Sequence, residues 1–197
     1  QSMDYEVAAI AQSCQNFLFA AIPVESWNDA LSPWKAPAVW GKQGFGGKAG
    51  DTLRFLTEQV VPTLKQQFNL PENVKIILGG YSLAGLFALY SIYQTDAFSR
   101  VASVSGSLWF PGIKEYVVSR TPVKKPADIF FSLGDRECRT QNSLLRCVQQ
   151  NTESIERYYH EQGIDTTFQL NPGNHFKDVV QRTAAGLQWL LSREYDP

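Results

Sequence analysis

The sequence predicts an α/β fold in three layers, with a mostly parallel sheet of about five to six strands covered by helices on both faces. Short apolar segments alternate along the chain with longer segments of helical periodicity. The apolar segments lack a polar face, which is typical of parallel strands buried on both sides. Since the 197 residues contain no internal repeat and no linker, we expect a single domain over residues 1–197.

The first third of the chain is expected to hold two helices and one strand. These elements are a helix at 4–14, a strand at 16–22, a loop at 25–50 and a helix at 51–68. Pro23 stops the strand, and the loop is rich in glycine, proline and tryptophan. Asp51 is a candidate N-cap for the second helix, and Pro62 predicts a kink or a break within it.

The rest of the chain alternates regularly between the two kinds of element. Strands are expected at 74–80, 100–106, 128–134 and 166–170, and helices at 83–94, 111–120, 144–163 and 179–194. The helix that begins at Leu83 is apolar on nearly every side, so we expect it to be buried. The long amphipathic helix is closed by Gly163. In the last helix an apolar stripe is expected to face the core, formed by Val180, Ala184, Leu187 and Leu191.

Charge and hydropathy indicate which kinds of binding partner are not expected. The net charge is −1, and no run of five like charges occurs, so neither nucleic acid nor a membrane surface is an expected partner. No apolar stretch reaches the ~18 residues of a spanning helix. The first residues lack the pattern of a secretory signal, which favours a cytoplasmic location.

Metals and organic cofactors are not expected. The chain has two histidines and no Cys-x-x-Cys, which leaves no ligand set with zinc-site spacing. Cys14, Cys138 and Cys147 are expected to be free thiols, with a Cys138–Cys147 bridge as the alternative in an oxidising compartment. The segment 44–49 fits a dinucleotide fingerprint formally, but a loop and not a strand precedes it.

The segment GGYSLAGLF places Ser82 at the junction of an expected strand and an expected helix. A nucleophile in such a tight turn needs very small neighbours two residues away on either side, and Gly80 and Ala84 stand there. The free N–H of Leu83, at the helix start, would point to where an oxyanion forms. A serine that only caps a buried helix is the alternative.

A serine nucleophile needs a base, and the base needs an acid that orients it. His160 lies in the amphipathic helix and is expected at the surface. His175 lies in NPGNHFKD, a loop that follows the last strand, where the base is expected. Asp135 and Glu137 follow another strand end in SLGDRE, and either carboxylate could accept the imidazole N–H.

With these residues in place, the chain resembles the putative-esterase group of α/β-hydrolases, which includes siderophore (enterobactin-type) esterases, S-formylglutathione hydrolases and feruloyl esterases. The similarity extends over most of the chain, from FLTEQVVPTLKQQF through the serine turn to GSLWFPG, SLGDRE and NPGNHF. It implies an α/β-hydrolase-like fold and a serine esterase that uses no cofactor. In this group the acid stands three residues after the glycine that ends its strand, which favours Glu137 over Asp135.

The resemblance also shows where the chain departs from the group. The expected strand at 16–22 looks like a later strand of the group, so the N-terminal strands are reduced or missing, and the loop 23–27 is a candidate source of the second oxyanion donor. The segment between the strands at 100–106 and 128–134 is too short for a lid domain. Trp27, Trp34 and Trp109 are candidates for binding a small-molecule ester, with core packing as the alternative.

Two other functions are compatible with the same residues. An incomplete oxyanion hole would favour a weak or inactive binding protein that has kept the fold. A thioesterase or an acyltransferase would use the same three side chains, with a thiol or an amine as the acyl acceptor.

Overall fold

The computed structural model describes residues 3–193, and at its centre is a four-stranded parallel sheet in the order β3-β4-β5-β6. The strands are β3 (Ile77–Tyr81), β4 (Arg100–Val104), β5 (Asp128–Gly134) and β6 (Asp165–Asn171). All four overlap the strand ranges expected from the sequence. The parallel α/β class is therefore confirmed, with a main sheet of four strands and two shorter strands in a separate ribbon.

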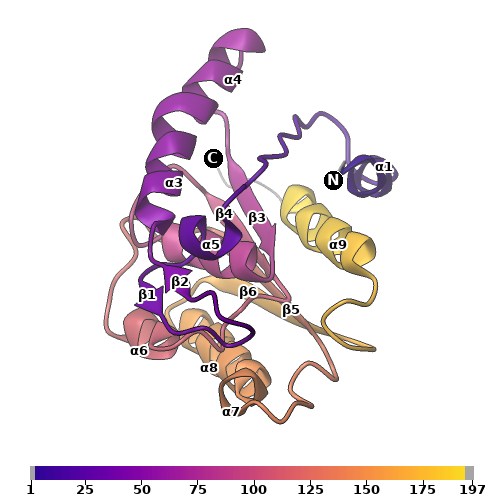
Figure 1. The fold of residues 1–197 in the computed structure, drawn as a ribbon. Coiled ribbons are helices and arrows are strands. Elements are labelled where there is room, and N and C mark those ends of the chain that lie inside the picture. The colour runs from indigo at the N-terminus through magenta and orange to yellow at the C-terminus, as the bar shows by residue number, and fades with distance from the viewer. Residues whose placement is uncertain (1–2, 194–197) are drawn as a thin grey trace.

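Helices cover both faces of this sheet (Figure 1). The main helices are α1 (Asp4–Ala11), α5 (Leu83–Ser91), α6 (Ile113–Val118), α8 (Val148–Glu161) and α9 (Val179–Ser192). Helix α9 packs on β3, β4 and β5, with α1 beyond it, whereas α5 and α8 pack on the opposite face. The alternation of side chains along β5 divides the core: Ile129 and Phe131 join the α5 and α8 side, and Phe130 joins the α9 side.

The expected strand at 16–22 is wrong. Residues 16–24 run from α1 to α2 (Trp27–Ala30) without forming a strand, and Leu18 and Ile22 are exposed. An apolar sequence favours a strand only when a neighbouring backbone is available for pairing, and β3 pairs with β4 alone among the described strands. The expected loop that follows contains a two-stranded antiparallel ribbon, β1 (Lys35–Ala36) with β2 (Phe45–Gly46).

Pro62 changes the geometry of its helix without ending it. The helical segment starts as α3 (Ala49–Phe55), widens into a π-helical turn, η1 (Leu56–Val60), and continues as α4 (Val61–Gln67). Because proline has no N–H and crowds the preceding turn, the wider turn accommodates it at the start of α4. The predicted N-cap at Asp51 is wrong: the helix starts two residues earlier, and Asp51 lies in the first turn, where it pairs with Arg54.

The buried face of α9 differs from the expected apolar stripe. Of the four expected residues only Ala184 is fully buried, whereas Arg182, Gly186 and Leu190 are buried as well. Gly186 lies so close to the sheet that an added Cβ would come within 2.9 Å of the Phe130 ring. Arg182 lies one turn before Gly186 on this same face and therefore also points toward the sheet. The last residue of the expected helix, 194, lies outside the described residues.

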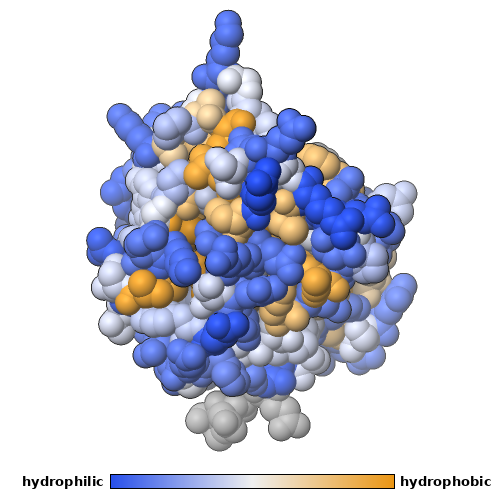
Figure 2. All heavy atoms as spheres, turned by 90° about the horizontal axis from the view of Figure 1, so that it is seen from below, coloured by the Kyte–Doolittle hydropathy of each residue, from blue (hydrophilic) through white to orange (hydrophobic). Residues whose placement is uncertain are grey.

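The remaining short helix is α7 (Ser143–Arg146), whose first N–H groups are capped by the Asn142 side chain. No helix among the described residues is long and apolar enough to cross a membrane. On the face shown in Figure 2, hydrophobic side chains lie in small separate groups among hydrophilic ones.

Candidate active site

Ser82 lies in a sharp turn between β3 and α5. Its backbone has φ 60° and ψ −121°, a conformation that costs a non-glycine residue about 1–3 kcal/mol. The turn is held by the Ser82 N–H, which donates to the Val104 carbonyl at 3.0 Å. A Cβ on Gly80 would come within 2.3 Å of the Ala84 carbonyl, so only glycine fits there. The turn therefore accepts alanine at position 84 but no side chain at position 80.

His175 lies between Ser82 and Glu137. Its Nε2 is 3.0 Å from the Ser82 Oγ, and its Nδ1 is 2.7 Å from the Glu137 Oε2. The backbone of the histidine is held by the Tyr81 hydroxyl, which donates to the His175 carbonyl at 2.6 Å. Burial raises the pKa of Tyr81, so the phenol keeps its proton for this bond. The His175 side chain remains 28% exposed, which leaves the imidazole accessible from solvent.

Glu137 lies just beyond the end of β5 with its carboxylate almost completely buried. Burial by itself would raise its pKa, but hydrogen bonds from His175 and from the Gly134 N–H lower the pKa of Glu137 below the usual carboxyl value. The Gly134 N–H donates to Oε1 at 2.6 Å, which leaves Oε2 for the imidazole. An ionised Glu137 fixes the proton on Nδ1, so the free lone pair of Nε2 faces the serine.

Asp135, the alternative acid, contacts a different part of the same loop. Its Oδ1 accepts a hydrogen bond from the Gly173 N–H at 2.7 Å, and its own N–H donates to the Asn171 carbonyl at 2.8 Å. The carboxylate also lies 4.0 Å from the Arg136 Nε. Asp135 thus ties the loop that follows β6 to the loop that follows β5, while Glu137 contacts the imidazole.

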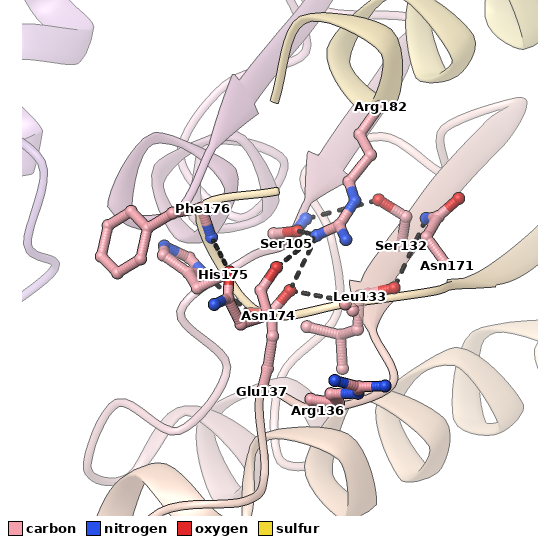
Figure 3. Close-up of polar contacts among 12 residues, drawn as sticks. Ser105, Ser132, Leu133, Arg136, Glu137, Asn171, Asn174, His175, Phe176 and Arg182 are labelled. Carbon is pink, nitrogen blue, oxygen red and sulfur yellow. Dashed lines mark hydrogen bonds and ion pairs between the residues drawn. The ribbon is translucent and has the colours of Figure 1, made fainter. Parts of the chain in front are cut away.

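Three polar residues of the site were not anticipated from the sequence. Ser107 Oγ lies 3.5 Å from the Ser82 Oγ, and the Ser107 N–H donates to the Ser82 carbonyl at 3.0 Å. Ser105 and Arg182 lie behind the histidine loop (Figure 3). The signal for Arg182 was its spacing of four and eight residues from Gly186 and Leu190, which puts all three on one helical face.

The three candidate tryptophans lie in different environments. The Trp34 indole N–H donates to the Pro111 carbonyl at 2.9 Å, and its ring packs on Phe110. Trp109 is only 7% exposed and belongs to the main apolar core. Packing thus accounts for both of these rings, as the alternative reading of the sequence expected. Trp27, on α2, is largely exposed.

A cavity of about 470 Å³ lies on the histidine loop. Its lining residues are Arg136, Pro172, Gly173, Asn174, Phe176 and Lys177. The Phe176 side chain is 84% exposed and packs edge-on against the His175 ring. Within residues 3–193, no group of three or more His, Cys, Asp or Glu side chains is placed to hold a metal ion.

The comparison with protein families decides between a hydrolase and another α/β protein. A model of the family described as Putative esterase matches residues 8–182. The chain belongs to this family. The expected class, an enzyme of the esterase type, is thereby confirmed.

Known proteins similar to this chain cover most of its length. The uncharacterized protein YbbA of Bacillus subtilis (strain 168) is 24% identical over 198 residues, which is 95% of this chain and 78% of YbbA. The siderophore hydrolase EstA from Aspergillus nidulans is 19% identical, with a TM-score of 0.67 over 86% of this chain and 69% of EstA. An IroE-like serine hydrolase from Shewanella oneidensis is 22% identical, with a TM-score of 0.61 over 76% of this chain and 49% of its own. These structures share the fold of the present chain.

Proposed function

We propose that the protein hydrolyses a carboxylic ester of a small molecule through an acyl-enzyme, with Ser82 as nucleophile, His175 as general base and Glu137 as the orienting acid. The observation that carries this proposal is the continuous hydrogen-bonded chain from the Ser82 Oγ through both ring nitrogens of His175 to the Glu137 carboxylate. Both distances lie in the range needed for proton transfer.

In the first half of the reaction, the Ser82 Oγ attacks the ester carbonyl carbon while His175 Nε2 takes the hydroxyl proton. Negative charge develops on the carbonyl oxygen of the tetrahedral intermediate. The free N–H of Leu83 at the start of α5 is the proposed donor to this oxygen, since the first N–H groups of a helix have no partner within the helix. Collapse of the intermediate breaks the bond to the alcohol, which leaves with the proton from Nε2.

In the second half, water takes the place of the alcohol. His175 Nε2 removes a proton from water, the hydroxide attacks the acyl carbon, and the serine leaves as its hydroxyl with that proton. Glu137 remains ionised throughout and stabilises the imidazolium that forms twice in the cycle. The lowered pKa of Glu137 suits this task, because a carboxylate that took up a proton would lose the charge that stabilises the imidazolium.

The class of substrate is supported from two sides. The family is one of esterases, and the similar structures include a siderophore hydrolase and a serine hydrolase. The open pocket on the histidine loop lies beside the site, and its lining of Phe176, Arg136 and Lys177 is the proposed contact surface for part of the substrate, although Ser82 and His175 do not line it.

Labelling with a fluorophosphonate probe tests the proposal directly, because the probe phosphonylates only an activated serine. We expect labelling of the wild-type protein and none of Ser82→Ala, with Ser119→Ala, an exposed serine just after α6, as the control that keeps the label. Equal labelling of wild type and Ser82→Ala, or none of either, would refute the assignment of Ser82.

Competition between nucleophiles tests the reaction class. With p-nitrophenyl acetate as acyl donor, a hydrolase gives acetate as its main product when thiols or amines are added at millimolar concentration. Preferential formation of a thioester or an amide would instead indicate an acyltransferase. No turnover of any ester together with retained folding would favour a binding protein.

A further inference from the structure

A single buried arginine contacts the segments that carry all three proposed catalytic residues. Arg182 lies in the first turns of α9 and is 3% exposed. Its guanidinium points away from its own helix and into the space between the carboxyl ends of the strands (Figure 3). A charge buried to this extent is costly unless several partners satisfy it.

The partners of Arg182 come from four separate segments. Its Nη1 donates to the Asn174 carbonyl at 3.1 Å, the Ser105 Oγ at 3.4 Å, the Glu137 Oε1 at 3.4 Å and the Tyr81 hydroxyl at 3.5 Å, and its Nη2 donates to the Pro172 carbonyl at 3.2 Å. These groups belong to the end of β3, the turn after β4, the loop after β5 and the loop after β6. Four of these five contacts share the two N–H groups of Nη1, and Nη2 makes the fifth, so the end of one guanidinium joins all four segments.

Several contacts of Arg182 lead directly to the proposed catalytic residues. Tyr81 precedes Ser82 and donates to the His175 carbonyl at 2.6 Å. Asn174 precedes His175, and Pro172 begins the same loop. Glu137 receives the guanidinium on Oε1 and the imidazole on Oε2. The guanidinium therefore fixes the imidazole from both sides: through the backbone of its loop and through the carboxylate that holds its Nδ1.

The closeness of these segments depends on two glycines. A Cβ on Gly134 would come within 2.3 Å of the Gly173 carbonyl and within 3.1 Å of the Arg182 Nη1. Gly173 itself has φ 115°, which other residues rarely adopt. A side chain at position 134 would therefore push apart the two loops that Arg182 contacts, and glycine at this position leaves room for the guanidinium.

We propose that Arg182 is a positioning residue of the esterase: it holds the loop of His175 and the carboxylate of Glu137 in register, so that the imidazole stays within hydrogen-bond distance of Ser82. This inference rests on the proposed function. Arg182 does not touch the Ser82 hydroxyl, and it acts through Glu137, Tyr81 and the loop backbone. Without the planar fork of the guanidinium, the imidazole would sample orientations in which Nε2 no longer faces the serine.

The test compares Arg182→Lys with Arg100→Lys. Arg100 is a second buried arginine paired with a carboxylate, but it lies at the opposite edge of the sheet. Positioning predicts that Arg182→Lys lowers kcat on p-nitrophenyl acetate about 10- to 100-fold with KM changed less than about twofold. The downfield NMR resonance of the His175 Nδ1 proton, bonded to the carboxylate, should weaken or move. Arg100→Lys should lower the thermal stability while keeping the kcat and this resonance.

Guanidinium at millimolar concentration gives a second readout. In Arg182→Ala it should restore part of the kcat, whereas methylammonium at equal concentration should not, because only the planar cation reproduces the fork.

Where Arg182→Lys does not fold, Arg182→Gln replaces it, since its amide can still donate to a loop carbonyl.

The proposal is overturned if folded Arg182→Lys keeps both the kcat and the resonance of the wild type. It is also overturned if the two lysine variants lose activity equally, in proportion to their unfolded fractions, or if neither Arg182→Lys nor Arg182→Gln folds, since the role would then be structural. A wild-type protein with no esterase activity and no fluorophosphonate label refutes the proposed function instead. The NMR resonance would still report on the positioning.

Discussion

The two edges of the sheet each bury an arginine beside a carboxylate, but the two pairs are built differently. At the amino edge, where the parallel strands begin, the Arg100 Nε lies 2.5 Å from the Asp128 Oδ2, and both side chains are almost fully buried. Arg193 contacts the other oxygen of Asp128 at 3.0 Å and also pairs with Asp165. At the carboxyl edge, where the strands end, the Arg182 Nη1 lies 3.4 Å from the Glu137 Oε1, and the Glu137 Oε2 is hydrogen-bonded to His175.

This difference separates a structural pair from a candidate functional one. Arg100, Asp128 and Asp165 stand at paired register positions on neighbouring strands, so the regular sheet places their charges side by side. At the carboxyl edge Glu137 and His175 come from loops and Arg182 comes from helix α9, and Ser82, Ser105 and Asp178 all have positive φ. Strained backbone occurs where a protein orients reactive groups, whereas Arg100, Asp128 and Asp165 stand on regular strands and none of them has a positive φ.

The largest contrast should come from the two histidines. His175→Ala removes the proposed base, and we expect kcat to fall by about 10⁴-fold or more. His160→Ala, on the exposed surface of α8, is the matched control and should retain the wild-type rate. Ester hydrolysis by both purified variants, with circular dichroism as the check on folding, gives the comparison. A near-normal rate in His175→Ala would contradict the assigned base.

The next largest effect should distinguish the two carboxylates of the carboxyl edge. Glu137→Gln keeps the shape of the side chain but loses the charge that holds the imidazole, so we expect kcat to fall by about 10²- to 10⁴-fold. Asp135→Asn should lose less than about tenfold, because Asp135 binds the loop backbone and not the ring. Steady-state kinetics of the two variants decide the identity of the acid. The reverse order of effects would assign it to Asp135.

A substitution at the amino edge should lower the free energy of unfolding and leave the rate of ester hydrolysis unchanged. Asp128→Asn leaves the buried charge of Arg100 without its carboxylate, and the loss of one partner from a buried pair costs about 3–5 kcal/mol. Urea unfolding should show this loss, while the kcat at 25 °C of the folded fraction stays within about twofold of the wild type. A selective fall in kcat would show that the two edges are coupled.

The smallest effect should appear in the pH dependence of stability. Because the pKa of Glu137 is lowered in the folded state, its carboxylate contributes stability that is present above the ordinary value of 4.5 and is lost as the pH falls through the lowered value. The difference in unfolding free energy between wild type and Glu137→Gln should therefore shrink between pH 5.5 and pH 3. A difference that grows over this range would mean that the pKa is raised.

Much of the fold and of the candidate site could be predicted because the signals are local. The strand of residues 128–134 is continuously apolar, and the helix that begins at Leu83 follows from the small residues around Ser82. The histidine loop and the acid loop were identified since each follows a strand, and parallel strands bring their carboxyl ends to one edge.

The remaining features depend on contacts between distant segments. The expected strand at 16–22 failed because pairing needs a neighbour. Arg182 was overlooked because a charged residue near the start of a helix usually faces solvent, whereas here it lies on the face of α9 whose Gly186 approaches Phe130.

The sequence by itself determined the order of the four strands of the main sheet, the sharp turn around Ser82 and the two loops that hold the other polar side chains, because each depends on residues near one another in the chain. Only the tertiary structure decided that Glu137 contacts the imidazole while Asp135 contacts the loop backbone, and that Arg182 lies beneath both loops. The contacts of Glu137 and Asp135 join residues that are 38 positions apart in the chain. The position of Arg182 depends on which face of α9 packs on the sheet. Such contacts exist only once the sheet has formed.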